Sequence, residues 1–317
     1  MPKTIRALIQ SPEPGKMAVA QAPAPIPGRG QVLVEVKVSA VNEMDVQVRA
    51  GLWAKNVKAF LKRGPVVTGF EFAGIARSDG GRIKAGDRVI GYVNVLSGPR
   101  THAGQVCVDE TDIEVIPQSW SLDDAAALVV MGLTAVEILE RLAPVSPGKR
   151  VLIIGAAGGV GVYTLQLAKH QGAHVTVVCS ERNAAWMKSM GANAVRAYET
   201  EPNFKTGDLF DVVVDVPCKE SFAASAPFLA RGGMYVGTNP LADLGGFVRA
   251  AFSSRRAGYL MMLTTTPAKL RRLIELAALG ALRPAIDSRF PLSQADQAFD
   301  RFETRGKQGR VLLKIED

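Results

Sequence analysis

The chain has 317 residues, of which 47% are apolar and 21% are charged. This composition is typical of a folded globular protein with two domains, and it excludes a disordered chain. The formal net charge is +8, but lysine and arginine are scattered and form only short pairs, so we expect no nucleic-acid partner. No apolar signal region follows the first residues, and the most apolar later stretch, 125–136, is too short to span a bilayer. We therefore expect a cytoplasmic protein that does not act at a membrane.

Residues 1–120 carry short apolar segments that are separated by proline and glycine. The segments that predict strands are TIRALIQ (4–10), PAPIPGRG (23–30), QVLVEVKVSAV (31–41), VVTGFEFAGIA (66–76) and DRVIGYV (87–93). Their even spacing predicts a compact, barrel-like β domain. The polar stretch 44–64 lies between them, and we expect it to form a loop with short helices over a cleft.

From residue 121 the pattern changes to alternating helices and strands. Ser121 followed by Asp124 is a capping-box variant, and it predicts the start of a helix over 121–142. Five apolar segments then predict parallel strands: VLIIG (151–155), HVTVVC (174–179), FDVVVDV (210–216), GGMYVG (232–237) and AGYLMML (257–263). Segments with helical spacing separate them, so residues 121–284 are predicted to form a doubly wound α/β domain.

The last part of the chain returns to a β-rich character. A strand-like segment at 285–292, a helix-like segment at 294–304 and a final strand-like segment at 309–317 follow one another. We expect residues 285–317 to complete the first domain, which would then be discontinuous. The predicted fold class is α/β, with a β-rich domain and a parallel-sheet domain.

Residues 151–161, VLIIGAAGGVG, read as a strand, a glycine-rich turn and the start of a helix. Glycine at 158 lets a pyrophosphate approach the backbone, and Gly161 lets the helix pack against its strand. The first N–H groups of the helix and its positive end would bind the phosphates. Placed inside a βαβ unit, this turn predicts a nicotinamide dinucleotide site.

The end of the second predicted strand indicates which dinucleotide is bound. An Asp or Glu there would accept hydrogen bonds from the ribose hydroxyls of NAD, but this strand ends in Cys179-Ser180-Glu181-Arg182. A hydroxyl and a guanidinium suit a 2′-phosphate. We therefore favour NADPH over NADH, although Glu181 could turn inward and serve NAD.

Several segments together resemble the zinc-independent, quinone-oxidoreductase-like branch of the medium-chain dehydrogenase/reductases. They are 32–51, 67–76, 86–92, 126–139, 151–173, 190–198, 210–216 and 309–315, and they run through nearly the whole chain. The resemblance implies a GroES-like catalytic domain, a Rossmann cofactor domain, and a cofactor and substrate held in the cleft between them. It also implies a homodimer, for which the edge of the cofactor domain at 257–265 is a candidate.

The resemblance also implies a set of cofactor contacts. Asn42 would lie near the nicotinamide ribose and Thr134 near the phosphate or the nicotinamide. Ser180, Arg182 and Tyr198 would surround the 2′-phosphate. Ala157, Gly158, Gly159, Val160 and Gly161 would form the phosphate turn, and Gly237, Thr238 and Leu263 would line the nicotinamide. Packing and capping are the alternative roles for Thr134 and Tyr198.

Zinc-binding relatives carry ligands that this chain lacks. They have a Cys where this chain has Asn42, a His-Glu pair at Phe70-Glu71, and a further Cys near Val130 and Met131. A catalytic zinc needs at least three protein ligands. Other candidate ligands are expected to be structural or exposed: His102, His170, His174 and the widely spaced Cys107, Cys179 and Cys218. We expect no metal.

Without zinc, reduction of a quinone or of an α,β-unsaturated carbonyl is favoured over alcohol oxidation, because hydrogen-bond donors can replace a Lewis acid there. Trp53, Phe60 and Phe70 suggest an apolar substrate pocket, although Phe70 could equally belong to the core. Asn42, Trp53 and Tyr92 are the cleft candidates, and the proton would come from water or Tyr92. Two alternatives remain open: a zinc-free alcohol or ketone reductase, and a non-catalytic relative that senses a dinucleotide or binds nucleic acid.

Overall fold

The computed structural model describes residues 3–11, 13, 15–52, 67–95, 98, 100–201, 208–262 and 264–315. The chain forms two compact units. The first comprises Met1–Val130, Leu263–Glu275 and Pro284–Asp317, and the second comprises Met131–Met262 and Leu276–Arg283. Candidate residues Trp53, Phe60 and Leu263 lie outside the described part of the chain.

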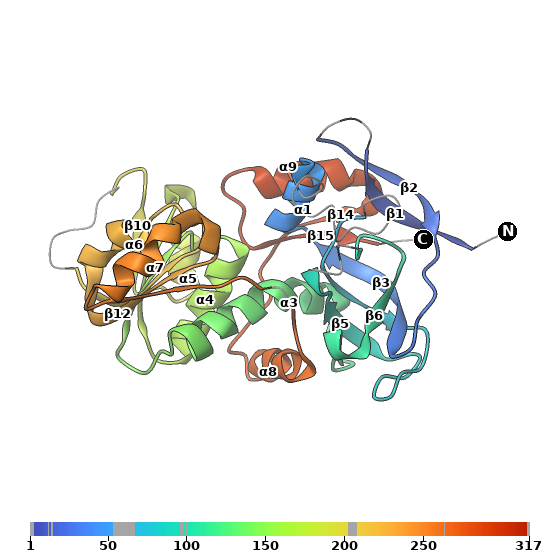
Figure 1. Ribbon diagram of the computed structural model, residues 1–317, viewed down its shortest axis with the longest axis horizontal. Helices are drawn as coiled ribbons and strands as arrows, with labels where there is room; N and C mark the ends of the chain where they lie inside the picture. Colours follow the sequence, from blue (N-terminus) through green and yellow to red (C-terminus); the bar gives the residue numbers. More distant parts are fainter. Residues whose placement is uncertain are drawn as a thin grey trace. The chain divides into compact units, whose positions relative to one another are not determined.

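Two β-sheets make up most of the first unit (Figure 1). The small sheet pairs β1 (Thr4–Gln10) with β2 (Met17–Pro23) in antiparallel fashion. The larger one has the order β14-β15-β3-β4-β5-β7, with β6 also paired to β3. Its strands are β3 (Gln31–Ala40), β4 (Glu71–Ala76), β5 (Arg88–Tyr92), β6 (Gln105–Asp109), β7 (Ile113–Val115), β14 (Ile286–Pro291) and β15 (Arg310–Lys314).

The centre of this sheet depends on apolar alternation and on one close backbone approach. Val32, Val34, Val36 and Val38 of β3 are all buried, at every second position as a strand requires. A Cβ at Gly74 of β4 would lie 2.2 Å from the carbonyl oxygen of Glu35. Only glycine therefore allows β4 to pair with β3 at this point.

The C-terminal segments of the chain belong to this larger sheet. The backbone of β15 pairs with β3, with Leu312 opposite Ala40, and β14 runs parallel to β15. In Figure 1 these red segments lie beside the blue β3. The helix α9 (Ala295–Glu303) packs on both β14 and β15.

Three more helices contribute residues to the first unit. They are α1 (Glu43–Arg49), α3 (Leu122–Val136) and α8 (Pro267–Ala278). The capping residue predicted at the start of α3 is confirmed, because the Ser121 hydroxyl accepts a hydrogen bond from the Asp124 N–H at 3.0 Å. A π-helical turn, Glu137–Leu142, continues α3.

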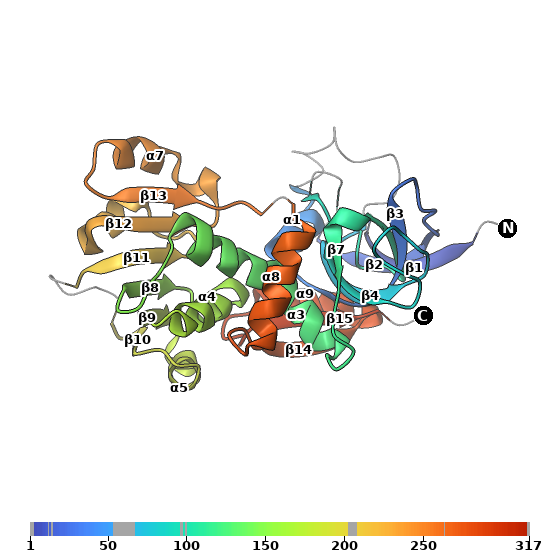
Figure 2. The ribbon, with the colours of Figure 1, turned by 90° about the horizontal axis from the view of Figure 1, so that it is seen from below.

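Six parallel strands form the sheet of the second unit (Figure 2). They are β8 (Arg150–Ile154), β9 (His174–Cys179), β10 (Ala194–Ala197), β11 (Phe210–Asp215), β12 (Leu229–Gly237) and β13 (Arg256–Tyr259). Their order, β10-β9-β8-β11-β12-β13, is that of a Rossmann domain, with the change of direction between β8 and β11. The predicted fold class is confirmed.

Short helices connect these strands: α4 (Gly159–His170), α5 (Ala184–Ser189), α6 (Phe222–Ser225) and α7 (Leu244–Ala251), with 3-10 turns at Glu181–Asn183, Ala226–Phe228 and Pro240–Asp243. A buried apolar cluster that includes Leu152, Phe210 and Tyr235 holds the centre of the sheet against α6. This rigid centre positions the carboxyl ends of the strands.

The sequence-based prediction differs from the structure in several details, and it named no strand at β2, β6 or β7. Residues 23–30 form no strand beyond Pro23, because Pro25 and Pro27 have no N–H to donate to a ladder. The last parallel strand ends at Tyr259, earlier than the apolar run suggests. The short β10 was missed, since its sequence AVRA is too brief to show a period.

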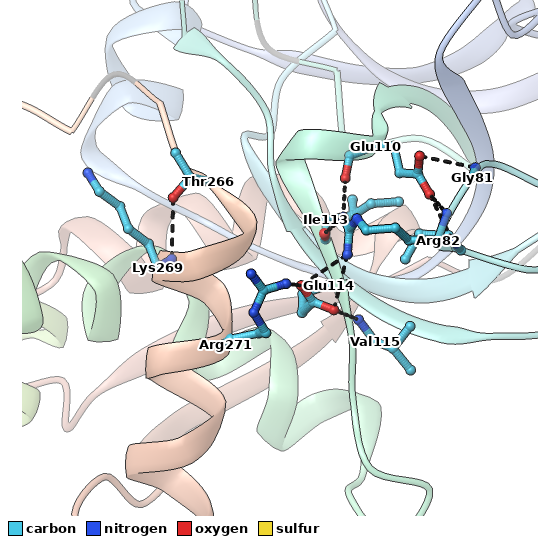
Figure 3. Close-up of polar contacts among 10 residues, drawn as sticks. Gly81, Arg82, Glu110, Ile113, Glu114, Val115, Thr266, Lys269 and Arg271 are labelled. Atoms are coloured by element: carbon cyan, nitrogen blue, oxygen red, sulfur yellow. Dashed lines mark hydrogen bonds and ion pairs between the residues drawn. The ribbon is translucent and has the colours of Figure 1, made fainter.

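Glu114 of β7 joins three parts of the first unit (Figure 3). Its carboxylate is 3.2 Å from Nη1 of Arg82 and 2.9 Å from Nη1 of Arg271 on α8, and the side chain is nearly buried. We expect Glu114→Gln to lower the free energy of unfolding by about 1–2 kcal/mol, since the guanidinium groups of Arg82 and Arg271 lose their counter-charge. Urea unfolding measures this. The exposed Glu13→Gln is the control, and an equal effect of both changes would contradict the prediction.

Candidate functional site

The turn between β8 and α4 has the geometry of a phosphate-binding loop. Gly155 has φ = 77°, in the left-handed region that favours glycine. A Cβ at Gly161 would lie 2.5 Å from both Ala156 Cα and the Gly155 carbonyl oxygen, so this glycine lets the helix pack on the turn. A Cβ at Gly158 would meet only the Gly155 carbonyl oxygen, at 3.5 Å. The backbone at Gly158 is therefore open to a ligand.

The first turn of α4 supplies donors to this opening. N–H groups in the first turn of a helix have no partner within the helix and carry its partial positive charge. In α4 these belong to Gly159, Val160 and Gly161. The turn follows β8, whose neighbour β11 marks the change in strand order where α/β domains bind dinucleotides. These residues fit a pyrophosphate.

The structure brings the predicted 2′-phosphate residues together at the ends of β9 and β10. The N–H of Tyr198 donates to the carbonyl of Cys179 at 3.1 Å, which places Tyr198 beside the Ser180 turn. Ser180 is buried, whereas Arg182 and Tyr198 are exposed. Sequence reasoning missed one residue at this place: the Glu199 carboxylate accepts a hydrogen bond from the Glu181 N–H at 3.0 Å.

The predicted nicotinamide residues lie at the end of β12 and in the following turn. The Thr238 hydroxyl donates to the Val216 carbonyl at 2.7 Å, and the Thr238 N–H donates to the sulfur of Cys218 at 3.1 Å. These bonds fix the turn against the end of β11. Gly237 and Thr134 are both buried.

A second group of polar residues is buried in the first unit, and we call it the Asn42–Glu71–Arg310 cluster. The Asn42 amide nitrogen donates to Glu71 Oε1 at 3.0 Å, and Arg310 Nη2 donates to Asn42 Oδ1 at 3.0 Å. Arg310 also forms an ion pair with Glu71. All three are at most 2% exposed. The cluster joins residues that are up to 268 positions apart in sequence.

The hydrogen-bonding groups of the Asn42 side chain already have partners within the protein. Its amide nitrogen donates to Glu71 and, at 3.3 Å, to the Ala40 carbonyl, so both amide hydrogens are engaged. Glu71 also accepts from the N–H of Val130 at 2.6 Å.

Burial sets the protonation of the carboxylates around this cluster. It raises the pKa of Glu71, and the Arg310 guanidinium opposes that rise. Asp45 is fully buried and accepts from the N–H groups of Asn42 (2.9 Å) and Gly69 (2.7 Å), yet burial still raises its pKa to about 7.

The raised pKa of Asp45 predicts a pH effect on stability. The folded chain holds this proton up to pH 7, whereas the unfolded chain loses it near pH 4, so the contribution of Asp45 to stability falls as pH rises across that window. We expect the wild-type free energy of unfolding to fall by about 2–4 kcal/mol more than that of Asp45→Asn between pH 4 and 8. Denaturant unfolding at several pH values measures both slopes, and equal slopes would refute the assignment.

The comparisons with known proteins cover both units. The alcohol dehydrogenase GroES-like domain matches residues 28–115, and the zinc-binding dehydrogenase domain matches residues 190–313. A 2-methylene-furan-3-one reductase from Solanum lycopersicum is 31% identical over 296 residues, which span 89% of this chain and 71% of the relative. The chain belongs to the medium-chain dehydrogenase/reductase family.

Further relatives place it in the quinone oxidoreductase-like group of this family. The chloroplast envelope quinone oxidoreductase homolog of Arabidopsis thaliana is 28% identical over 309 residues, 93% of this chain and 92% of that protein. The solved quinone oxidoreductase of Coxiella burnetii has a TM-score of 0.89 at 29% identity, and the match covers 99% of this chain and 100% of that one. This medium-chain enzyme is an oxidoreductase, and its family implies a nicotinamide dinucleotide cofactor.

The description of one matching domain raises the question of zinc. The positions that carry zinc ligands in zinc-binding relatives lie close together in this structure. Glu71 accepts hydrogen bonds from both Asn42 and Val130. Their donors are an amide, a carboxylate already paired with Arg310, and a backbone N–H. Within the described ranges no three His, Cys, Asp or Glu side chains are grouped to hold a metal. This donor set does not fit zinc.

The histidines are placed as the sequence suggested. His102 is fully buried, with Nδ1 2.7 Å from the Thr68 hydroxyl oxygen and Nε2 3.2 Å from the Ala40 carbonyl oxygen, and burial lowers its pKa to about 4. It is therefore a neutral structural residue. His170 and His174 are exposed.

The cleft candidate Tyr92 and the pocket candidate Phe70 are both buried. Tyr92 is fully buried, and burial together with the charges of Glu71 and Asp45 raises its pKa above the usual value. Phe70 is also fully buried, as a core residue would be.

None of the described helices is long and apolar enough to cross a bilayer.

Proposed function

We propose that this enzyme reduces quinones or α,β-unsaturated carbonyl compounds with NADPH and without zinc. The observation that carries the proposal is the Asn42–Glu71–Arg310 cluster, which has no set of zinc ligands. Alcohol oxidation would lack its Lewis acid, whereas hydride addition to an electron-poor alkene or quinone needs only hydrogen-bond donors. The names of the Arabidopsis and tomato relatives, a quinone oxidoreductase homolog and a furanone reductase, support this substrate class.

The residues of the second unit would bind the cofactor. When bound, NADPH supplies the hydride. The first turn of α4 binds the pyrophosphate, and Ala157 and Gly158 leave it room. Ser180, Arg182 and Tyr198 hold the 2′-phosphate through hydroxyl and guanidinium donors. Gly237 and Thr238 would line the nicotinamide, with Thr134 beside it, while the contacts expected of Asn42 and of Leu263, which lies outside the described residues, remain predictions.

The proton that completes the reduction would come from water. Tyr92 is the other candidate, but its raised pKa makes it a weak acid. The role expected of Trp53 in an apolar substrate pocket remains a prediction, because Trp53 lies outside the described residues.

An acceptor panel tests the proposed activity. NADPH consumption is followed with quinones, alkenals, alkenones and simple ketones under one condition. We expect turnover with the first three classes and little with ketones. Turnover of ketones alone would replace the proposal by a ketone reductase, and NADPH binding without any turnover would support the non-catalytic alternative.

We also propose a homodimer through the free edge of the parallel sheet. The strand β13 is the last in the strand order. Beside it, α7 and its flanks expose Leu241, Leu244, Val248 and Phe252 to solvent by 63% or more. Such an apolar stripe next to an open edge suits a second copy of the chain. Light scattering would give twice the 33.8 kDa chain mass, and a monomer at micromolar concentration would refute the dimer.

A further inference from the structure

The Glu199 carboxylate lies at the place where a dinucleotide presents its adenosine ribose. One oxygen accepts the backbone N–H of Glu181 at 3.0 Å, directly after the end of β9. The bond from the Tyr198 N–H to the Cys179 carbonyl, at 3.1 Å, holds this segment against β9. The charge of Glu199 also reaches the end of the strand, because it adds to the effect of burial in raising the pKa of Cys179.

Charged side chains of both signs lie on the two segments that meet at Glu199. Arg196 of β10 forms an ion pair with Asp208, so its charge is neutralised there. Arg182 lies on the Ser180 turn, and Glu181 and Glu201 are exposed acids on the two segments. The turn therefore combines one guanidinium, which attracts an added phosphate, with carboxylates that repel it.

The chemistry of the two dinucleotides differs at this point. In a Rossmann domain an acidic residue after the second strand accepts hydrogen bonds from the ribose hydroxyls of NADH. Here β9 ends at Cys179 and Ser180 follows it, and Glu199 comes two residues after the neighbouring strand β10 ends at Ala197. A 2′-phosphate would meet this carboxylate and would compete with it for the Glu181 N–H.

We infer that Glu199 is a specificity-determining residue that accepts the ribose 2′-hydroxyl of NADH and weakens the binding of a 2′-phosphate. Arg182 and Glu199 then act in opposite directions, so the wild-type enzyme uses both dinucleotides with a moderate ratio. This inference rests on the proposed dinucleotide function. It concerns the balance between the two cofactors, which the proposal of NADPH leaves unspecified.

The variant Glu199→Gln tests the inference, since it removes the charge and keeps the shape. Dissociation constants for NADPH and NADH are measured by titration of the full chain, together with kcat/KM for each cofactor. We expect NADPH to bind about tenfold more tightly and NADH several-fold more weakly, so that the ratio shifts by tenfold or more. Glu199 is exposed, so the variant should fold, and its Tm verifies this.

Two further variants separate the possible outcomes. Glu201→Gln removes an exposed charge of the same segment, and it should leave both constants unchanged. Arg182→Gln should weaken the binding of NADPH and leave the binding of NADH unchanged. An unchanged ratio in Glu199→Gln would overturn the inference even if the wild type binds NADPH. If the wild type prefers NADH and Glu199→Gln reverses this, the inference stands and the NADPH assignment fails. If the wild type binds neither dinucleotide, both fail.

Discussion

Replacing Arg310 by methionine is expected to lower the free energy of unfolding by about 3–5 kcal/mol, because it leaves the buried carboxylate of Glu71 without its counter-charge. Arg310 is 1% exposed and Glu71 is fully buried. The guanidinium donates to both Glu71 and the Asn42 amide. Loss of one partner therefore unpairs a charge and a polar group together, in a place where water cannot replace them.

The double variant Arg310→Met, Glu71→Gln separates charge from packing. Removing the second charge should recover most of the lost stability, since the penalty comes from the unpaired carboxylate. Arg231→Met, at an exposed position, is the matched control and should change stability by less than about 0.5 kcal/mol. Urea unfolding of the wild type, Arg310→Met, Glu71→Gln and the double variant gives the coupling energy. Additive effects of the two cluster substitutions would contradict the assignment.

Alanine substitutions at Gly158 and Gly161 are expected to separate ligand binding from folding. A Cβ at Gly158 makes only an ordinary contact, at 3.5 Å, so Gly158→Ala should fold normally. Its methyl group would stand where the pyrophosphate approaches the backbone, and dinucleotide affinity should fall about tenfold or more.

Gly161→Ala should damage both properties. Its Cβ would lie 2.5 Å from backbone atoms of Ala156 and Gly155, which cannot yield as a side-chain end can. We expect a stability loss of about 1–3 kcal/mol and a large loss of affinity, because α4 must move away from the turn. Gly245→Ala, in α7 with no atom within 4 Å of its Cβ, is the control. Calorimetric titration and thermal unfolding measure both quantities, and normal binding by Gly158→Ala would contradict the placement of the pyrophosphate.

The sequence predicted the parts of the fold that depend on local patterns. The β8-turn-α4 unit is visible because its glycines and apolar run occupy adjacent positions, and the Ser121 cap is visible for the same reason. The end of β9 at Cys179 was also predicted, and Ser180 and Arg182 follow it in the turn. Each of these features involves residues within about ten positions of one another, where periodicity and capping carry information.

The missing parts depend on contacts between distant residues. Arg310 is one basic residue among 38 in the sequence, and nothing local shows that it is buried against Asn42 and Glu71. Glu199 meets the Glu181 N–H only because β10 pairs with β9. A signal did exist for Arg310: it begins an apolar strand, RVLLK, in which its charge needs a buried partner.

The proposed reaction of this medium-chain oxidoreductase is hydride transfer from NADPH to an unsaturated acceptor without zinc. The most direct test is the rate of NADPH oxidation by a quinone in protein stripped of metal with a chelator, with its zinc content verified by elemental analysis. We expect an unchanged kcat in zinc-free protein. Loss of activity that returns on adding one equivalent of zinc would contradict it.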